Sequence, residues 1–134
     1  MSSVKDFILE DITVLEETEE IKFPQFKSPF VVRSIGAVEF EEIRKNNTRR
    51  HTNRKTGQTT TELDTERFTS ELITRGVKSP NLMSEELQTA YGTLGDSAGT
   101  ARKMLKAGQY AELGERIQSL SGFDLDTLVE EVKN

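Results

Sequence analysis

Apolar residues recur at steps of three and four along the C-terminal third of the chain, which is the periodicity of an amphipathic helix. The clearest stripe consists of Tyr110, Leu113, Ile117 and Leu120. Shorter stripes precede it, each beside a residue that commonly caps a helix. We therefore predict a series of short helices from residue 64 onwards, the last of them over residues 125–132. The expected N-caps are Asp64 or Thr65, Ser84 and Asp96, and the expected stops are Gly76, Gly92, Gly108 and Gly122.

The N-terminal half of the chain shows an alternating pattern instead. Ile21 and Phe23 flank a polar residue, and Phe30 and Val32 repeat the same spacing of two, which predicts two short strands joined by a loop. Gly36 is then expected to start a helix, with Glu39 three residues later as in a capping box and Ile43 on the apolar face.

A turn is expected at residues 55–58, Lys-Thr-Gly-Gln, because Gly57 can supply the positive φ of a tight turn. Three threonines follow at residues 59–61, and threonine favours strands. This segment is predicted to form a short, exposed hairpin or a flexible loop.

Together these patterns predict a mainly α fold of the α+β type. It has an N-terminal pair of short strands and a small hairpin near residues 55–61, followed by a bundle of four to five short helices. Residues 1–20 are predicted to be an acidic arm and residues 21–134 a single, mainly helical domain. In the arm, apolar residues at near-helical spacing suggest a short helix, and four glutamates follow between residues 16 and 20.

Composition narrows the function classes. The chain has 134 residues, a net charge of −5 and no cysteine. The negative charge argues against a general nucleic-acid binder, and the lack of cysteine excludes disulfides and thiolate metal sites. Neither a signal peptide nor an apolar run long enough for a membrane span is found, so we expect a cytoplasmic protein without membrane contact.

Residues suited to catalysis are scarce. His51 is the only histidine, and no carboxylate lies beside it in the sequence to orient its ring. Adjacent glutamate pairs such as Glu41-Glu42 point apart on a helix, so they cannot share a proton or a metal ion. We therefore predict no catalytic, metal-binding or cofactor-binding residues, and no enzymatic activity.

A basic segment over residues 44–55 is the most unusual local feature. It holds six arginine and lysine residues and no acidic residue. Such a segment can be a solvated loop, can meet an acidic surface such as the arm of the same or a neighbouring copy, or can neutralise nucleic-acid phosphates. It lacks aromatic residues for base stacking. The candidate contact residues are Arg49, Arg50, Arg54 and Lys55.

The order of signals over residues 80–123 resembles one protein family. The motifs that carry the resemblance are Pro80-Asn81-Leu82, Glu86-Leu87-Gln88, Tyr91-Gly92, Met104-Leu105, Gly108-Gln109-Tyr110, Ala111-Glu112-Leu113 and Ser121-Gly122-Phe123, with weaker matches at residues 37–45 and 55–58. In this order they are similar to the XkdN-like phage tail assembly chaperones of contractile-tailed phages and of defective prophages in Gram-positive bacteria.

The resemblance implies a non-enzymatic assembly factor that binds the tape-measure and tail-tube proteins in the bacterial cytoplasm and is absent from the mature virion. It supplies no cofactor and no catalytic motif. Homo-oligomer formation is left open, and the alternative function is a small nucleic-acid-binding or regulatory protein of a mobile element that acts through residues 44–55. The expected partner-binding residues lie on the predicted helices: Leu87, Tyr91, Met104, Leu105, Tyr110 and Leu113.

Overall fold

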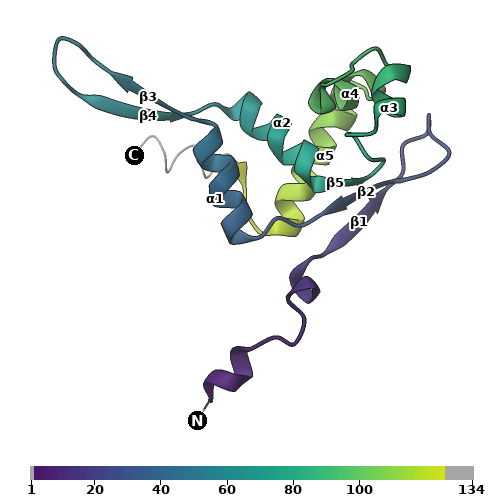
Figure 1. The fold of residues 1–134 in the computed structure, drawn as a ribbon, viewed down its shortest axis with the longest axis horizontal. Helices are drawn as coiled ribbons and strands as arrows, with labels where there is room; N and C mark the ends of the chain where they lie inside the picture. The colour runs from purple at the N-terminus through teal and green to yellow at the C-terminus, as the bar shows by residue number, and fades with distance from the viewer. Residues whose placement is uncertain (1, 126–134) are drawn as a thin grey trace.

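The computed structural model describes residues 2–125, which form a mixed α+β fold of five α-helices and five strands (Figure 1). The strands make two separate sheets, one of three strands and one of two. The predicted mainly α fold is therefore wrong, because the helices pack around a sheet instead of forming a bundle. Strand β5 (Val77–Ser79) was not predicted, since three residues directly after a helix are too few to show an alternating pattern. The helix expected over residues 125–132 lies almost entirely outside the described residues.

The three-stranded sheet contains the predicted N-terminal strand pair. Strand β1 (Thr18–Ile21) is antiparallel to β2 (Phe30–Arg33), and β2 is also antiparallel to β5. The strand pair is thus confirmed, and β2 is the central strand. Because β1 begins at Thr18, the last three residues of the acidic segment 1–20 lie in the sheet. The division into an arm and one domain stays a prediction.

The two-stranded sheet is a long hairpin formed by β3 (Thr48–Thr52) and β4 (Thr59–Leu63). The predicted hairpin is confirmed, but it is longer than residues 55–61. Gly57 has a φ of 72° in the turn between the strands, as expected for glycine there. Of the ten strand residues only Leu63, at the base, is buried. The hairpin projects from the rest of the molecule (Figure 1).

Helices α1 (Ala37–Asn46) and α2 (Thr65–Gly76) flank the hairpin in the sequence. Gly36 is the N-cap of α1, as predicted, but no side chain caps this end. The capping role expected of Glu39 is therefore wrong, because its carboxylate binds arginines instead. Asp64 caps α2 by accepting a hydrogen bond of 3.2 Å from a backbone N–H of the first turn, which confirms the prediction.

Two short helices, α3 (Glu85–Ala90) and α4 (Ser97–Met104), follow β5. The hydroxyl of Ser84 accepts from a backbone N–H at 3.3 Å, and the carboxylate of Asp96 accepts from one at 2.8 Å. Both predicted N-caps are confirmed. Local cap chemistry was therefore a good guide to where these helices begin.

Helix α5 (Ala107–Ser121) is the longest in the described part of the chain. Gly122 ends it in the left-handed conformation with a φ of 79°, as predicted. The break expected at Gly108 is wrong, since this glycine lies in the first turn and the preceding helix has already ended at Met104. One buried glycine of α2, Gly76, lets α5 approach, because a Cβ there would clash with the side chain of Ile117.

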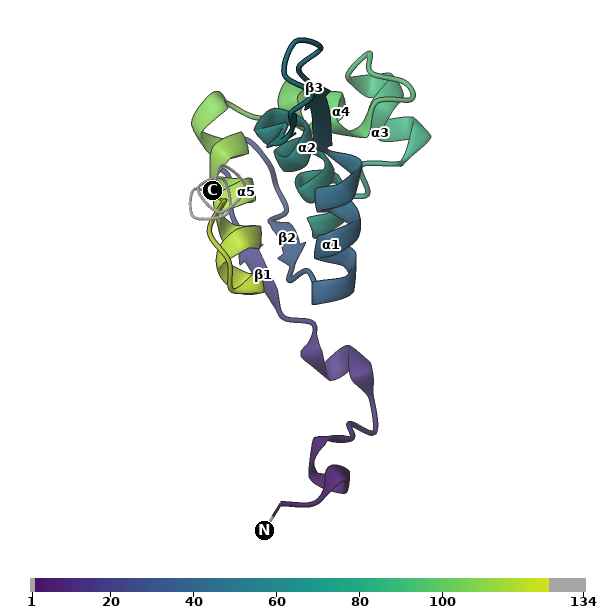
Figure 2. The same ribbon diagram turned by 90° about the vertical axis from the view of Figure 1, so that its left-hand side faces the viewer.

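Helix α2 lies at the centre of the fold and contacts α1, α4, α5 and β5, while α5 also packs against β2 (Figure 2). The ring of Phe68 on α2 is fully buried and meets the rings of Phe40 and Phe123 edge-on, at centroid distances of 5.9 and 6.3 Å. The core draws on every helix except α3 and on four strands. Its hydrophobic residues are Ile21, Phe23, Phe30, Val32, Ile35, Ile43, Leu63, Phe68, Leu72, Ile73, Val77, Leu82, Ala101, Leu105, Leu113 and Ile117.

Candidate partner-binding surfaces

The N-terminal arm, defined here as residues 2–17, extends away from the folded body (Figures 1 and 2). It contains two single turns of 3-10 helix, η1 (Val4–Phe7) and η2 (Ile12–Leu15). Ser3 and Asp11 cap these turns through hydrogen bonds within the arm. The single short helix expected here is thus replaced by two turns, neither of which has a buried residue.

The arm concentrates the exposed apolar surface of the protein. Ten large hydrophobic side chains are exposed among the described residues, and seven of them belong to the arm. Their exposed fractions range from 45% to 78%. Large apolar side chains gathered and exposed in one segment of a folded protein indicate an interaction site. The seven residues are Val4, Phe7, Ile8, Leu9, Ile12, Val14 and Leu15.

Acidic side chains alternate with the apolar groups of the arm. Residues 2–17 carry five carboxylates and one lysine, a net charge of −4. A hydrogen bond from the hydroxyl of Thr13, at 2.6 Å, lowers the pKa of the Asp11 carboxyl below its ordinary value. Because carboxylates outnumber lysines five to one, the arm is strongly anionic at neutral pH, which disfavours contact with an anionic membrane surface and favours a partner with basic groups.

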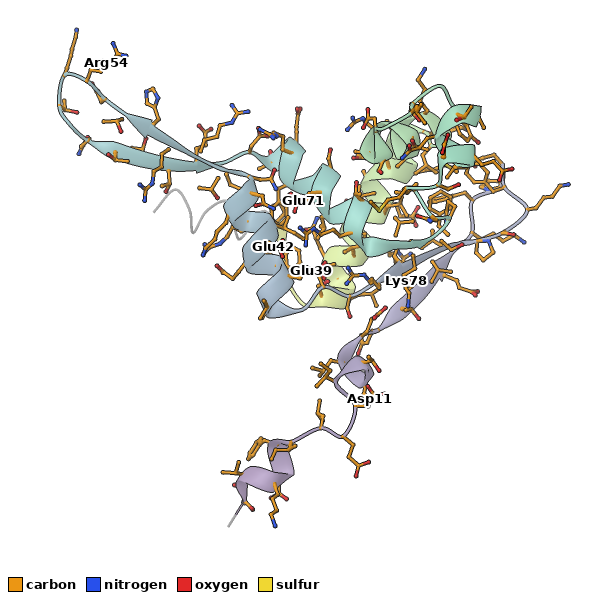
Figure 3. All side chains as sticks on the ribbon, in the orientation of Figure 1. Asp11, Glu39, Glu42, Arg54, Glu71 and Lys78 are labelled. Carbon is orange, nitrogen blue, oxygen red and sulfur yellow. The ribbon has the colours of Figure 1, made fainter. Side chains whose placement is uncertain are left out.

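The root of the arm is fixed to the sheet. The carboxylate of Glu16 pairs with Lys78 of β5 at 2.9 Å (Figure 3). The backbone of Glu17 exchanges hydrogen bonds with Ser34, donating to its hydroxyl and accepting from its N–H, both at 2.8 Å. These contacts set the direction in which residues 2–15 leave the body.

The basic hairpin, defined here as residues 48–63, is the second projection. The structure places the four predicted contact residues Arg49, Arg50, Arg54 and Lys55 on β3 and in the turn, with Arg54 at the tip (Figure 3). Arg49 pairs with the helix cap Asp64 at 2.7 Å, so it is partly neutralised. The other three take part in no ion pair within residues 2–125. Whether this hairpin binds nucleic acid stays a prediction.

The six partner-binding residues predicted on the helices lie in or beside the core. Leu113 is fully buried and Leu105 is 9% exposed, so both stabilise the fold. Leu87, Met104 and Tyr110 are partly buried and pack against the core, and Tyr91, also partly buried, is the C-cap of α3. A groove beside Met104 reaches the loop after β1, where Gln25 bonds to Gln109. A role of these six residues in partner binding stays a prediction.

Sequence reasoning missed the apolar side chains of the arm as candidate contacts. The arm was interpreted mainly from its acidic residues 16–20, whereas the exposed apolar residues precede them. One available signal was that Phe7, Leu9 and Val14 do not fall on the helical stripe of the other apolar residues. Apolar residues on all sides of a short acidic segment cannot all be buried against one neighbouring surface.

A cluster of charged side chains joins β2, α1 and α2. Glu39 accepts two hydrogen bonds of 2.9 Å from the guanidinium of Arg33 and one of 3.3 Å from Arg75. Arg75 also reaches Glu42 and Glu71, each at 3.1 Å (Figure 3). The cluster is half-buried, so its charges are screened less than those of surface pairs. It holds α1 in place at the base of the hairpin.

The hydrogen bonds from Arg33 lower the pKa of the Glu39 carboxyl below its ordinary value of 4.5. The folded state therefore binds fewer protons than the unfolded state, and this contribution to stability is present above pH 4.5 and is lost as the pH falls through the lowered pKa. Glu39→Gln is expected to lower the free energy of unfolding by about 1–3 kcal/mol at pH 7 and by less at pH 3. Urea midpoints at both pH values measure this.

Glu41→Gln is the matched control, because Glu41 lies on the same helix and its side chain is 51% exposed in a pair with Arg44. We expect a change below about 1 kcal/mol for this exposed pair. An equal loss for both variants at pH 7, or a Glu39→Gln effect that does not shrink in acid, would contradict the role given to the cluster.

Potential metal ligands are dispersed over residues 2–125. No group of three or more histidine, cysteine, aspartate or glutamate residues within this range is placed to hold a metal ion. His51 is exposed on β3, where only its backbone carbonyl accepts a side-chain hydrogen bond, from Thr60 at 3.3 Å. Among the described helices, none is both long and apolar enough to cross a bilayer.

Comparison with known proteins identifies a family. A model described as "Phage XkdN-like tail assembly chaperone protein, TAC" matches residues 4–133. The Phage-like element PBSX protein XkdN of Bacillus subtilis strain 168 is 31% identical over 130 residues, which covers 88% of this chain and 86% of that protein. The protein YqbN of the same strain is also 31% identical over 130 residues.

A solved structure has the same fold. The crystal structure of the protein YqbN superposes with a TM-score of 0.67 and covers 92% of this chain and 99% of that chain. Sequence identity over this superposition is 21%, so the similarity supports a shared fold and nothing more. The mixed α+β architecture is thus shared with an experimentally determined structure.

Proposed function

Because the chain belongs to the family of XkdN-like phage tail assembly chaperones, we propose that it binds the tape-measure and tail-tube proteins before they assemble, and that it does so without enzymatic activity. It acts in the cytoplasm of the bacterial host and is absent from the mature virion. The observation that carries this proposal is the apolar arm, in which seven of the ten exposed large hydrophobic side chains of the described residues gather.

A chaperone of this kind must cover apolar surface on a partner until that surface is buried in the assembled tail. The arm suits this task because its apolar side chains are already exposed and need no unfolding of the body to become available. Each such side chain contributes about 1.5–3 kcal/mol when it becomes fully buried, so several together can hold a partner. The charge of the arm favours partner segments that combine apolar and basic residues.

The anchored root supports the same function. Glu16 and Glu17 are tied to β5 and to the loop after β2, so the arm starts from a fixed point on a stable domain. A bound partner segment is then held beside the folded body. Four of the partner-binding residues predicted on the helices are half-buried and provide a second, weaker contact. These four partly exposed residues are Leu87, Tyr91, Met104 and Tyr110.

Co-expression tests the proposal. The tape-measure protein of the same phage or prophage is produced alone and together with this chain, and the soluble fraction and the material that co-purifies with a tagged chain are measured. We expect the chain to increase the soluble tape-measure protein several-fold and to form a complex with it. A tape-measure protein that stays insoluble and does not co-purify would contradict the proposal, and the tail-tube protein is tested in the same way.

A further inference from the structure

We propose that the basic hairpin of one chain binds the acidic arm of a second copy, so that the protein associates with itself when no tail protein is present. The two projections carry opposite charge. The arm has a net charge of −4, and the hairpin has four basic residues against one acidic residue, a net charge of +3. This self-association does not depend on which tail protein the chain binds.

The charged side chains that would form this contact have no ion-pair partner among residues 2–125. Glu10 and Glu17 of the arm form no side-chain ion pair within residues 2–125, and neither do Arg50, Arg54 and Lys55 of the hairpin. All five residues are exposed. Attraction between two such surfaces guides association and sets its register.

The arm cannot easily reach the hairpin of its own chain. In Figure 1 the hairpin projects to the left from the upper part of the body, whereas the arm leaves from the lower part and runs downward, as it also does in Figure 2. The contacts of Glu16 with Lys78 and of Glu17 with Ser34 fix the point from which the arm leaves the body. A second copy is therefore the nearest source of the complementary surface that this sequence itself provides.

The backbones of the two projections are also complementary. The hairpin has only two strands, so among the described residues no third strand pairs with either of its edges. In the arm, Ile8 and Asp11 have extended backbone conformations, with φ and ψ of −93° and 116° and of −134° and 108°. The stretch between the two 3-10 turns bends at Glu10, and once straightened there it can add to an edge of the hairpin as a short strand.

Apolar contacts between the arm and the hairpin can add to the charge pairing. The hairpin strands contain five threonines, whose methyl groups line the ladder beside the aliphatic stems of the arginines. Seven exposed apolar side chains on the arm offer a surface on the order of the roughly 800 Å² that each partner buries in a stable complex. Nucleic acid fits the hairpin less well, because the hairpin carries no phenylalanine, tyrosine or tryptophan on which bases could stack.

A charge-exchange experiment tests this pairing. The arm variant is E10K/E17K and the hairpin variant is R50E/R54E, and all four residues are exposed and outside any ion pair of residues 2–125. We expect each variant alone to self-associate at least about tenfold more weakly than the unaltered chain in sedimentation velocity at low salt. An equimolar mixture of the two variants should associate again, because the unaltered arm of the hairpin variant, with a net charge of −4, then meets the unaltered hairpin of the arm variant, with a net charge of +3.

The control variant K27E/K103E changes the same number of exposed charges on the loop after β1 and on α4, and should self-associate like the unaltered chain. The proposal would be overturned if the unaltered chain is monomeric at about 100 μM, or if the mixed variants do not associate with each other. A salt-sensitive gel shift with DNA that R50E/R54E abolishes, without any self-association, would assign the hairpin to nucleic acid instead. Co-purification of tape-measure protein with the same variants is measured separately. Loss of self-association can therefore be distinguished from loss of tape-measure binding.

Discussion

Replacing Phe68 with alanine is expected to lower the free energy of unfolding by about 3–5 kcal/mol, a large share of the roughly 5–15 kcal/mol that stabilises a domain. The side chain is fully buried on the central helix α2 and lies edge-on to the rings of Phe40 and Phe123. Its removal leaves a cavity between α1, α2 and the segment after α5, where the rings of Phe40 and Phe123 now pack against it. Chemical denaturation followed by far-ultraviolet circular dichroism measures the loss.

Phe7→Ala provides a matched control, because it removes the same atoms from a side chain that is 77% exposed in the arm. We expect a change within about 0.5 kcal/mol for this substitution. Similar losses for Phe7→Ala and Phe68→Ala would mean that the arm packs against the body in solution, and would contradict the description of the arm as an exposed projection.

The second large effect is expected on partner binding. The triple variant F7S/I12S/L15S removes three apolar side chains that are 70–77% exposed. If these side chains are buried by the tape-measure protein, each contributes about 1.5 kcal/mol or more, and the affinity should fall at least about a hundredfold. The amount of tape-measure protein that co-purifies with the variant, and its affinity by interferometry, give the readout.

The variant V38S/M83S/L94S is the control for this experiment. It changes the other three exposed large hydrophobic residues of the described chain, which are 68–86% exposed but lie on the body. Partner binding should stay within a few-fold of the unaltered protein. Equal losses in both triple variants would show that exposed apolar area in general, and not the arm, determines binding.

Local signals predicted the helix ends well. Asp64, Ser84 and Asp96 cap their helices as expected, and Gly122 ends α5 in the left-handed conformation. These features depend on hydrogen bonds between residues a few positions apart, so a short stretch of sequence contains all the information. Gly108 was misjudged because glycine is tolerated in the first turn of a helix that packing holds in place.

Features that depend on distant residues were not predictable in the same way. Strand β5 forms because Val77 meets Val32 of β2, forty-five positions earlier in the chain. The charge cluster around Glu39 likewise joins three elements, and the sequence offered only a capping role for that residue. The exposure of the arm depends on the absence of a neighbouring surface in the fold, which no local pattern encodes.

The central claim is that the arm is the part of the chain that binds unassembled tail proteins. Hydrogen exchange of the full chain, measured with and without purified tape-measure protein from the same phage, tests it directly, because most hydrogen bonds of the arm amides lie within exposed single turns in the free chain. We predict that binding slows exchange in residues 2–17 at least tenfold, while α2 and α5 are unchanged. A complex that leaves these residues unprotected and slows exchange elsewhere would contradict the account.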